Sequence, residues 1–371
     1  GFGLLQRATA RLRSRKRFSW GKTRGGDHWQ EFLTKDAGRY IEIQAGLGKT
    51  QYGCLPMAPH TAWEWMERYG AVQIRGQEME KSFEELRGTV TAEVKAMPQW
   101  QEMEQILADT KKMAKTRAEV IRRGSGFGAL EAQLREQCGD RKMEPHLDFA
   151  GSEEDPGRWA EFLEKGTLEI PDPAELPGVY VTGREFYDRL KKYVDENEAA
   201  GWYAYYQLGV LLFQEGDYEA AKKEFLRSIE SQENAWACHG LASVYTVEGR
   251  KKEACSAVRI GFCLQREDLS YVKEVFRLLV MNKGFREVEE LYQELDEEMQ
   301  KEGRIRFFYI QALAENGREK EAYRLLRADG GLVIDDIREG ETSLGELWRK
   351  IRAAGENGEE ELPYEFDFTA L

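Results

Sequence analysis

The sequence predicts a mainly α-helical chain in which a solenoid of stacked helix pairs follows a few β-strands. Four similar segments recur at intervals of 33, 35 and 33 residues, and they begin at Gly216, Gly249, Gly284 and Gly317. A repeat of that length accommodates two helices of three to four turns and two short turns. Apolar residues between the glycines recur at steps of three and four, which is the helical spacing. Short runs of alternating β-branched and aromatic residues lie near the N-terminus and predict strands there.

The first repeat shows how a helix pair is encoded. The apolar face of its first helix is formed by Tyr205, Leu208, Leu212 and Phe213. We expect Gly216 to end this helix, because glycine adopts the left-handed conformation that other residues resist. Asp217 then caps the second helix, whose stripe includes Ala221 and Phe225. Gly209 lies where the second helix must approach closely, since glycine has no side chain to hold it away.

The period and the residue pattern resemble the tetratricopeptide (TPR) repeat, whose period is 34 residues. The positions that match its pattern in type or identity are Tyr205, Leu208, Gly209, Ala221 and Phe225. The final proline of the pattern is missing, and the third repeat has Glu289 at a small-residue position. Such solenoids usually bind a peptide or another domain on their concave face, although repeats also serve as plain scaffolds. An unrelated helical bundle with coincidental glycines is the alternative.

Composition divides the chain into five parts. We expect the end of a β-rich domain over 1–70, a helical wrap over 71–138, a proline-rich linker over 139–180, TPR-like repeats over 181–353 and an acidic, aromatic tail over 354–371. Two or three strands do not form a stable sheet alone. Either further strands precede this sequence or the strands pack on the helices. The tail either folds back as an extended segment or is a disordered end.

Local patterns place the individual elements. We expect strands at 17–20 and 39–44, and glycine turns at 25–26, 46–48 and 124–128. We expect helices over 62–69, 79–97, 129–138, 158–164 and 184–194, with further helices around 100–107 and around 120–121. A last helix is expected to begin with a capping box formed by Ser343 and Glu346.

The charge and cysteine content limit the class of protein. The net charge is −13, although the first 24 residues hold eight basic residues and no acid. The repeats are therefore strongly acidic, which argues against nucleic acid as their main ligand. Five cysteines without a CxxC pair indicate a reducing cytoplasm. The sequence has no apolar run long enough to cross a membrane and no metal-ligand motif, so we expect no membrane partner, metal or cofactor.

Two basic or glycine-rich segments suggest phosphate binding, and in both cases another interpretation is favoured. The arginines between positions 7 and 17 alternate, which is typical of the solvated face of a strand. The segment GLGKT at 46–50 resembles the end of a nucleotide-binding P-loop. The first glycine of that motif is replaced by Ile43, however, and two prolines follow where a helix is required.

Polar and aromatic residues near the N-terminus are typical of a sugar site. Aromatic faces stack on the C–H patches of a sugar, while carboxylates and amides bind its hydroxyls. The candidates are Glu42 and Glu64 for catalysis and His28, Trp29, Gln44, Gln51 and Trp63 for substrate binding. Glu42 and Gln44 are expected to share one face of a strand. Composition alone favours an ordinary sheet edge.

The same segments resemble an uncharacterised bacterial family, domain of unknown function 5107. The matching segments are GGDHWQEFL at 25–33, YIEIQAGL at 40–47, TQ at 50–51, PMAP at 56–59 and AWE at 62–64. That resemblance implies the last strands of a galactose mutarotase-like β-sandwich followed by TPR repeats. It also implies that Glu42 acts as general base and that Gln44 holds a neighbouring hydroxyl. The acidic partner in mutarotases is a histidine on earlier strands, so this chain alone is expected to be catalytically incomplete.

Two functional hypotheses follow. In the first, the chain is the C-terminal part of a carbohydrate-binding or carbohydrate-active protein with a TPR interaction module. A glycosidase would need a second carboxylate, for which Glu64 or Asp27 is available. In the second, the chain is a non-enzymatic scaffold that binds a peptide or protein on the concave face of the repeats, and Glu42 is dispensable.

Overall fold

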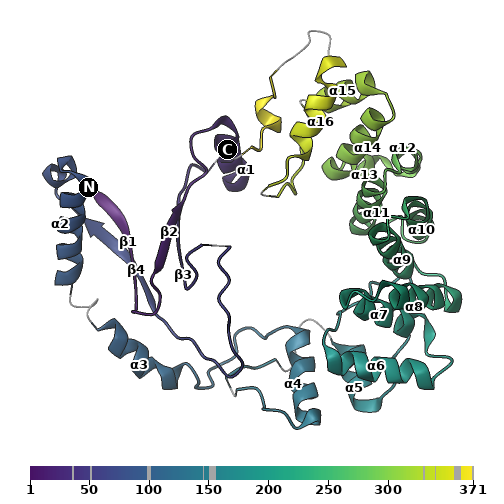
Figure 1. Cartoon of the computed structure of the whole chain (residues 1–371), viewed down its shortest axis with the longest axis horizontal. Helices are drawn as coiled ribbons and strands as arrows, with labels where there is room; N and C mark the ends of the chain where they lie inside the picture. Colours follow the sequence, from purple (N-terminus) through teal and green to yellow (C-terminus); the bar gives the residue numbers. More distant parts are fainter. Residues whose placement is uncertain are drawn as a thin grey trace. The chain divides into compact units, whose positions relative to one another are not determined.

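The chain folds as two compact units. The computed structural model describes residues 1–35, 37–50, 52–97, 102–144, 146–149, 156–328, 331–338, 340–354 and 361–369. The N-terminal unit comprises residues 1–120 and 144–147, and the repeat unit comprises residues 121–143 and 148–369. Most described residues lie in helices, and strands occur in the N-terminal unit (Figure 1). The predicted mainly helical fold class is confirmed.

The N-terminal unit contains two antiparallel strand pairs (Figure 1). β1 (Phe2–Ala8) pairs with β4 (Glu67–Gln73), and β2 (Ser14–Phe18) pairs with β3 (Glu42–Gly46). In the second pair Lys16 lies opposite Gln44, and Phe18 lies opposite Glu42. These strands overlap the two predicted strand segments. The helices of this unit are α1 (Arg24–Thr34), α2 (Phe83–Ala96) and α3 (Met103–Met113), with a 3₁₀ helix at Gly76–Glu80.

The expected glycine turn at 25–26 is wrong, because these glycines lie in the first turn of α1. Thr23 caps the helix by accepting a hydrogen bond from the Gly26 amide at 3.1 Å. A Cβ atom at Gly26 would collide with the Trp20 carbonyl oxygen, so only glycine lets the backbone at these two positions approach so closely. The helix forms because Trp29 is buried and stacks on Trp20 with ring centroids 5.3 Å apart.

The predicted helix at 62–69 is also wrong. Residues 67–69 begin β4, and residues 61–66 adopt no regular structure. Pairing with β1 decides the conformation, and this contact between residues about sixty positions apart leaves no local pattern. The helix predicted over 79–97 is present as α2, and Phe83 at the start of its apolar stripe is 76% exposed. Residues 120–121 are not helical.

The repeat unit is a succession of helix pairs (Figure 1). Before the repeats lie α4 (Gly126–Cys138), α5 (Gly157–Lys165) and α6 (Arg184–Glu196). The first helices of the pairs are α7 (Gly201–Gln214), α9 (Ala235–Val247), α11 (Leu269–Met281) and α14 (Gly303–Glu315). The second helices are α8 (Tyr218–Ser231), α10 (Lys251–Leu264), α12 (Phe285–Glu294) and α15 (Glu319–Arg327), with the short α13 (Glu297–Lys301) before α14. The first helices contact one another in sequence and form a continuous row, and α16 (Ser343–Ile351) closes the series on α14 and α15.

The first helix pair forms as the sequence predicts. Gly216 has a φ of +81° at the end of α7, and Asp217 accepts a hydrogen bond from the Ala220 amide at 3.1 Å. Gly209 faces Phe225 of α8, which is 1% exposed. Gly249 and Gly317 also have positive φ, whereas in the third pair Lys283 adopts the left-handed conformation instead of Gly284.

Two predicted details of the repeat unit are corrected. The loop expected over 124–128 ends earlier, because Ser125 caps α4 by accepting from the Gly128 amide at 3.3 Å. In the described residues at the start of α16, Ser343 and Glu346 do not form the predicted capping box. Ser343 donates to Glu341 at 2.7 Å, and Thr342 donates to Glu346 at 2.7 Å.

Residues 171–180, which we call the proline strap, pack against the starts of α7 and α9. The strap has no regular structure, yet Pro171 and Pro177 are buried. Side chains donate hydrogen bonds to its carbonyl oxygens: Trp202 to Pro171 at 3.0 Å, Trp236 to Pro173 at 3.0 Å, Gln265 to Ala174 at 3.4 Å, Tyr203 to Pro177 at 2.6 Å and Trp159 to Val179 at 2.8 Å. The strap is therefore an irregular segment, with a turn at residues 172–175, that neighbouring helices hold through its backbone carbonyls.

The described part of the tail, residues 361–369, folds back onto α16. Phe366 is 1% exposed and lies 5.9 Å from Trp348 between ring centroids. The Trp348 indole donates to the Glu361 carbonyl at 3.1 Å. Of the two expectations for the tail, the structure shows the folded-back segment for these residues.

Candidate functional site

The carboxylate and amide predicted to act together do lie together. Glu42 and Gln44 are half-buried on one face of β3, and Gln44 donates a hydrogen bond to Glu42 Oε2 at 2.6 Å. Alternation along the strand is the cause, because residues two positions apart project to the same side. The Gln44 amide nitrogen is therefore engaged, and its oxygen remains an acceptor for a ligand hydroxyl.

The other predicted site residues are not gathered around this pair. Trp29 is 1% exposed inside the packing of α1, so its ring offers no face to a sugar. His28 is half-buried on the same helix, and Trp63 is half-buried in the irregular segment before β4. Glu64 forms an ion pair with Lys111 at 2.7 Å and lines a different hollow from Gln44. Gln51 lies outside the described residues.

Gln44 lines a hollow of about 590 Å³, which we call the strand hollow. Its walls come from β2, β3, the glycine-rich loop that follows β3, and the start of β4. The lining residues with charged or polar side chains are Ser14, Arg15, Lys16, Gln44, Lys49, Thr50, Glu67 and Tyr69. The sequence analysis did not identify Glu67 and Tyr69 as site residues, because it predicted a helix over 62–69 where the structure has the start of β4.

Glu67 is the carboxylate of the strand hollow. It accepts hydrogen bonds from Tyr69 at 2.8 Å, Gln6 at 2.9 Å and Trp65 at 3.1 Å. The hydrogen bond from Tyr69 is the main cause that holds the pKa of Glu67 below its ordinary value. Glu67 is therefore an ionised group whose acceptor capacity is largely used.

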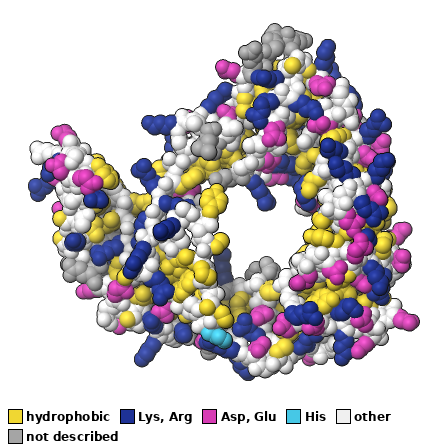
Figure 2. Space-filling view, in the orientation of Figure 1, with side chains coloured by type: hydrophobic (Ala, Val, Ile, Leu, Met, Phe, Trp, Pro, Cys, Tyr) yellow, Lys and Arg dark blue, Asp and Glu magenta, His cyan; other side chains and the backbone are white. Residues whose placement is uncertain are grey.

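A second hollow of about 590 Å³ lies on the row of first helices, and we call it the array hollow. Residues of α11, α14 and the segment before α16 line it. Its apolar floor comprises Val280, Met281, Phe307 and Phe308, and its charged rim comprises Lys273, Glu274, Arg277, Arg304, Asp336, Arg338 and Glu341. Figure 2 shows positive and negative side chains interleaved over the visible face of this unit, so no single sign dominates there.

Most charges of the rim are already paired. Arg304 contacts Glu341 at 2.5 Å and Asp336 at 2.7 Å, which holds the segment before α16 against α14. Lys273 contacts Glu302 at 2.6 Å. Arg338 is exposed, and the described residues supply no acid to its side chain. Within the described part of the rim, Arg338 is therefore the cation available to a ligand.

Glu274 carries the most strongly shifted carboxyl group of the rim. Its pKa is lowered from 4.5 to about 2, first by the imidazole of His239 and then by the guanidinium of Arg277. The His239 Nε2 atom lies 3.7 Å from Glu274 Oε2, a charge contact that requires a protonated imidazole. Arg277 lies at 2.6 Å. Glu274 thus stays ionised across ordinary pH and positions Arg277 at the edge of the hollow.

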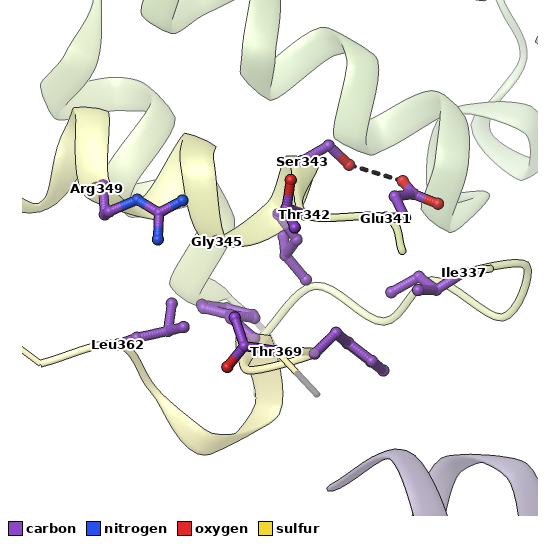
Figure 3. Close-up of a pocket in the computed structure, with 11 residues that line it drawn as sticks. Ile337, Glu341, Thr342, Ser343, Gly345, Arg349, Leu362 and Thr369 are labelled. Atoms are coloured by element: carbon purple, nitrogen blue, oxygen red, sulfur yellow. Dashed lines mark hydrogen bonds between the residues drawn. The ribbon is translucent and has the colours of Figure 1, made fainter. Parts of the chain in front are cut away.

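The hollow next to the end of the array is small and filled by the tail. Figure 3 shows Leu362 and Thr369 of the tail on one side of it, with Thr342 and Ser343 at the start of α16 on the other. The hydrogen bond between Ser343 and Glu341 links this corner to the rim of the array hollow. Glu341 and Ser343 line both the small hollow beside the tail and the array hollow, so the two hollows are adjacent.

Comparison with known proteins assigns part of the array. A family model for the tetratricopeptide repeat matches residues 203–234. The TPR match covers most of α7 and all of α8, the pair in which the predicted residue pattern is most complete. No curated protein matches the chain. The resemblance to domain of unknown function 5107 and to mutarotases gains no support from these comparisons.

The TPR repeat suggests a protein-interaction module, and the mainly helical architecture of the described residues agrees with a TPR-like solenoid. Within the part of the chain that the structure describes, no helix combines the length and apolar character needed to cross a bilayer.

Proposed function

We propose that the repeat unit binds an extended peptide segment of a partner protein in the array hollow. The observation that carries this proposal is the combination of an apolar floor and a charged rim on the row of first helices. Floors of this kind take the side chain of an anchoring residue, while polar groups at the rim fix the orientation of the peptide. Met281 is 52% exposed on the floor, so an apolar side chain is available for contact.

The proline strap supports the proposal, because it shows the array holding an irregular segment through its backbone carbonyls. Indole and phenol groups of α7 and α9 donate to strap carbonyls at 2.6–3.0 Å. Backbone carbonyls are present in any peptide, so this form of recognition does not depend on one sequence. The strap covers the starts of the first two pairs, whereas the array hollow lies further along the same row.

The rim indicates which peptides fit. Among the described residues, Arg338 is the rim cation without an acidic partner, and Arg277 is held at the edge of the hollow by Glu274. A peptide with one bulky apolar residue flanked by an acidic residue would match both the floor and these cations. We therefore expect selected ligands to share an apolar anchor next to Asp or Glu.

Selection from a random peptide library against the full chain tests the proposal, followed by titration of the enriched peptides. Met281→Lys places a charge on the apolar floor and is expected to weaken binding about tenfold or more. Ile260→Lys is the matched control, because Ile260 is 55% exposed on α10 and takes no part in the hollow. Enriched peptides that bind both variants equally would contradict the proposal, as would a failure to enrich any peptide.

A sugar site at Glu42 and Gln44 is a second candidate function. The observation that favours it is the carboxylate–amide pair on β3, whose members are 2.6 Å apart and half-buried. Titration with mono- and oligosaccharides tests it. Glu42→Gln is expected to abolish binding, while Glu80→Gln on the exposed 3₁₀ helix of the same unit serves as control. Binding that is indifferent to Glu42→Gln would refute this function.

A further inference from the structure

We propose that the strand hollow is a binding site for a small phosphorylated metabolite, that Lys16 and Lys49 bind its phosphate group, and that Arg15 adds positive charge at its wall. These three cations and one carboxylate, Glu67, are the charged residues among those that line the hollow. An excess of positive charge in a concave site concentrates anions there. A phosphate monoester offers three oxygen acceptors and thus matches several donors at once.

Arg15 is held in place before any ligand arrives. Its Nη1 atom donates to the carbonyls of Leu12 at 2.7 Å and Ser14 at 2.9 Å, and its Nε atom donates to Gln6. Among the described residues, its Nη2 atom has no acceptor. Arg15 and Lys16 are adjacent on β2 and project to opposite faces. Arg15 therefore supplies fixed positive charge at the wall of the hollow, while Lys16 lies on the side of Gln44.

The carboxylate of the hollow has neutral donors as its main partners, although the charge of Arg15 also helps to lower the Glu67 pKa. Glu67 accepts hydrogen bonds from the side chains of Tyr69, Gln6 and Trp65. Gln6 also accepts from Arg15, so one amide links the arginine to the carboxylate. This network forms one wall of the hollow and fixes Arg15, while Lys16 and Lys49 keep their ammonium groups free of acids among the described residues.

The glycine-rich loop after β3 supplies further donors. The amides of Gly48, Lys49 and Thr50 have no acceptor within the described part of the chain. A Cβ atom at Gly48 would lie 2.6 Å from the Gly53 carbonyl oxygen, so the loop closes tightly only with glycine there. The segment is not a nucleotide-binding P-loop, because no helix follows it among the described residues up to position 66.

The volume argues for a metabolite larger than inorganic phosphate. About 590 Å³ lies within the range of small-molecule sites, and a phosphate group fills only part of it. Ser14, Gln44 and Thr50 provide neutral polar groups for the remainder of the ligand. The proposal is independent of peptide binding. It shares Gln44 with the sugar hypothesis but does not require Glu42.

The experiment is calorimetric titration of the full chain with glucose 6-phosphate, glucose, inorganic pyrophosphate and ATP at low salt. We expect glucose 6-phosphate to bind and glucose to bind at least tenfold more weakly, because the phosphate supplies the charge-assisted contacts. Lys16→Gln and Lys49→Gln are each expected to weaken binding about tenfold. Lys22→Gln is the matched control, since Lys22 is exposed in the same unit and does not line the hollow.

Loss of binding in the two hollow variants with retention in Lys22→Gln supports the site. Equal weakening by all three variants would show a diffuse positive field and overturn it. Binding of pyrophosphate or ATP without binding of glucose 6-phosphate would overturn the choice of a phosphorylated metabolite. Sensitivity to Glu42→Gln but not to Lys49→Gln would favour the sugar site instead. Circular dichroism spectra establish that each variant remains folded.

Discussion

Phe225 is wedged between two glycines, and replacing either glycine is expected to destabilise the repeat unit. The ring lies between Gly209 of α7 and Gly240 of α9 and is 1% exposed. A Cβ atom at Gly209 would lie 2.7 Å from Phe225 Cε1, and one at Gly240 would lie 2.5 Å from the same atom. Non-bonded carbon atoms prefer about 3.5–4.0 Å, so neither methyl group fits unless the helices move apart.

The magnitude follows from two opposing effects. Overpacking a core by one methyl group costs about 1–3 kcal/mol. Replacing glycine by alanine within a helix returns about 1 kcal/mol through helix propensity. We therefore expect Gly209→Ala and Gly240→Ala each to lower the free energy of unfolding by up to about 2 kcal/mol, with the larger loss at Gly240 because its contact is closer.

Urea denaturation followed by circular dichroism measures these free energies. Gly345→Ala is the matched control, because a Cβ atom there meets only ordinary contacts, the nearest at 3.7 Å, and is expected to be neutral or stabilising. Phe225→Leu removes the ring, so its combination with Gly209→Ala should be less destabilising than the sum of the two single changes. Strict additivity, or a Gly209→Ala variant more stable than the parent protein, would refute the steric conflict with Phe225.

Three further predictions concern the strap, the tail and the array hollow. Trp236→Phe keeps an aromatic ring at this position but removes the indole N–H that donates to Pro173. Hydrogen exchange in the strap should become faster, and the free energy of unfolding should fall by about 1 kcal/mol; unchanged protection would contradict this prediction. Phe366→Ala should cost about 3–5 kcal/mol and release the tail from α16, which limited proteolysis would detect; an intact, protease-resistant tail would refute this. Because folding lowers the pKa of Glu274 to about 2, its stabilisation is complete above pH 4.5 and is lost as the pH falls from about 4.5 to about 2. Glu274→Gln should therefore flatten the stability profile in that acid range, and an unchanged profile from urea midpoints would exclude the contribution.

The repeat unit could be predicted from sequence because its determinants are local. Gly216 and Asp217 are adjacent, and each acts on the helix next to it through its own backbone or side chain. Gly209 and Phe225 lie within one repeat, so a single period encodes both partners of the contact. The strap was not predicted as a packed element, because its carbonyl acceptors are present in every residue and leave no pattern in the sequence.

The N-terminal unit was predicted less well, because its structure depends on distant partners. β4 forms by pairing with β1, about sixty residues earlier, and α1 forms around the stacking of Trp29 on Trp20. Local composition favoured a helix where β4 begins and a glycine turn where α1 begins. Glu42 and Gln44 were placed correctly on one face, since strand alternation is a local property. The contribution of Glu67 and Tyr69 to the hollow could not be predicted, because it depends on the pairing of β4 with β1.

The two hollows differ in what each demands of a ligand, and this difference follows from how their charges are balanced. In the array hollow, Arg304 and Lys273 are neutralised by acids of the chain, so an incoming peptide gains mainly from burying an apolar side chain. In the strand hollow, Lys16 and Lys49 have no such acids among the described residues, so a ligand gains mainly by supplying negative charge. Raising the salt concentration from 50 to 200 mM should therefore weaken ligand binding in the strand hollow much more than in the array hollow.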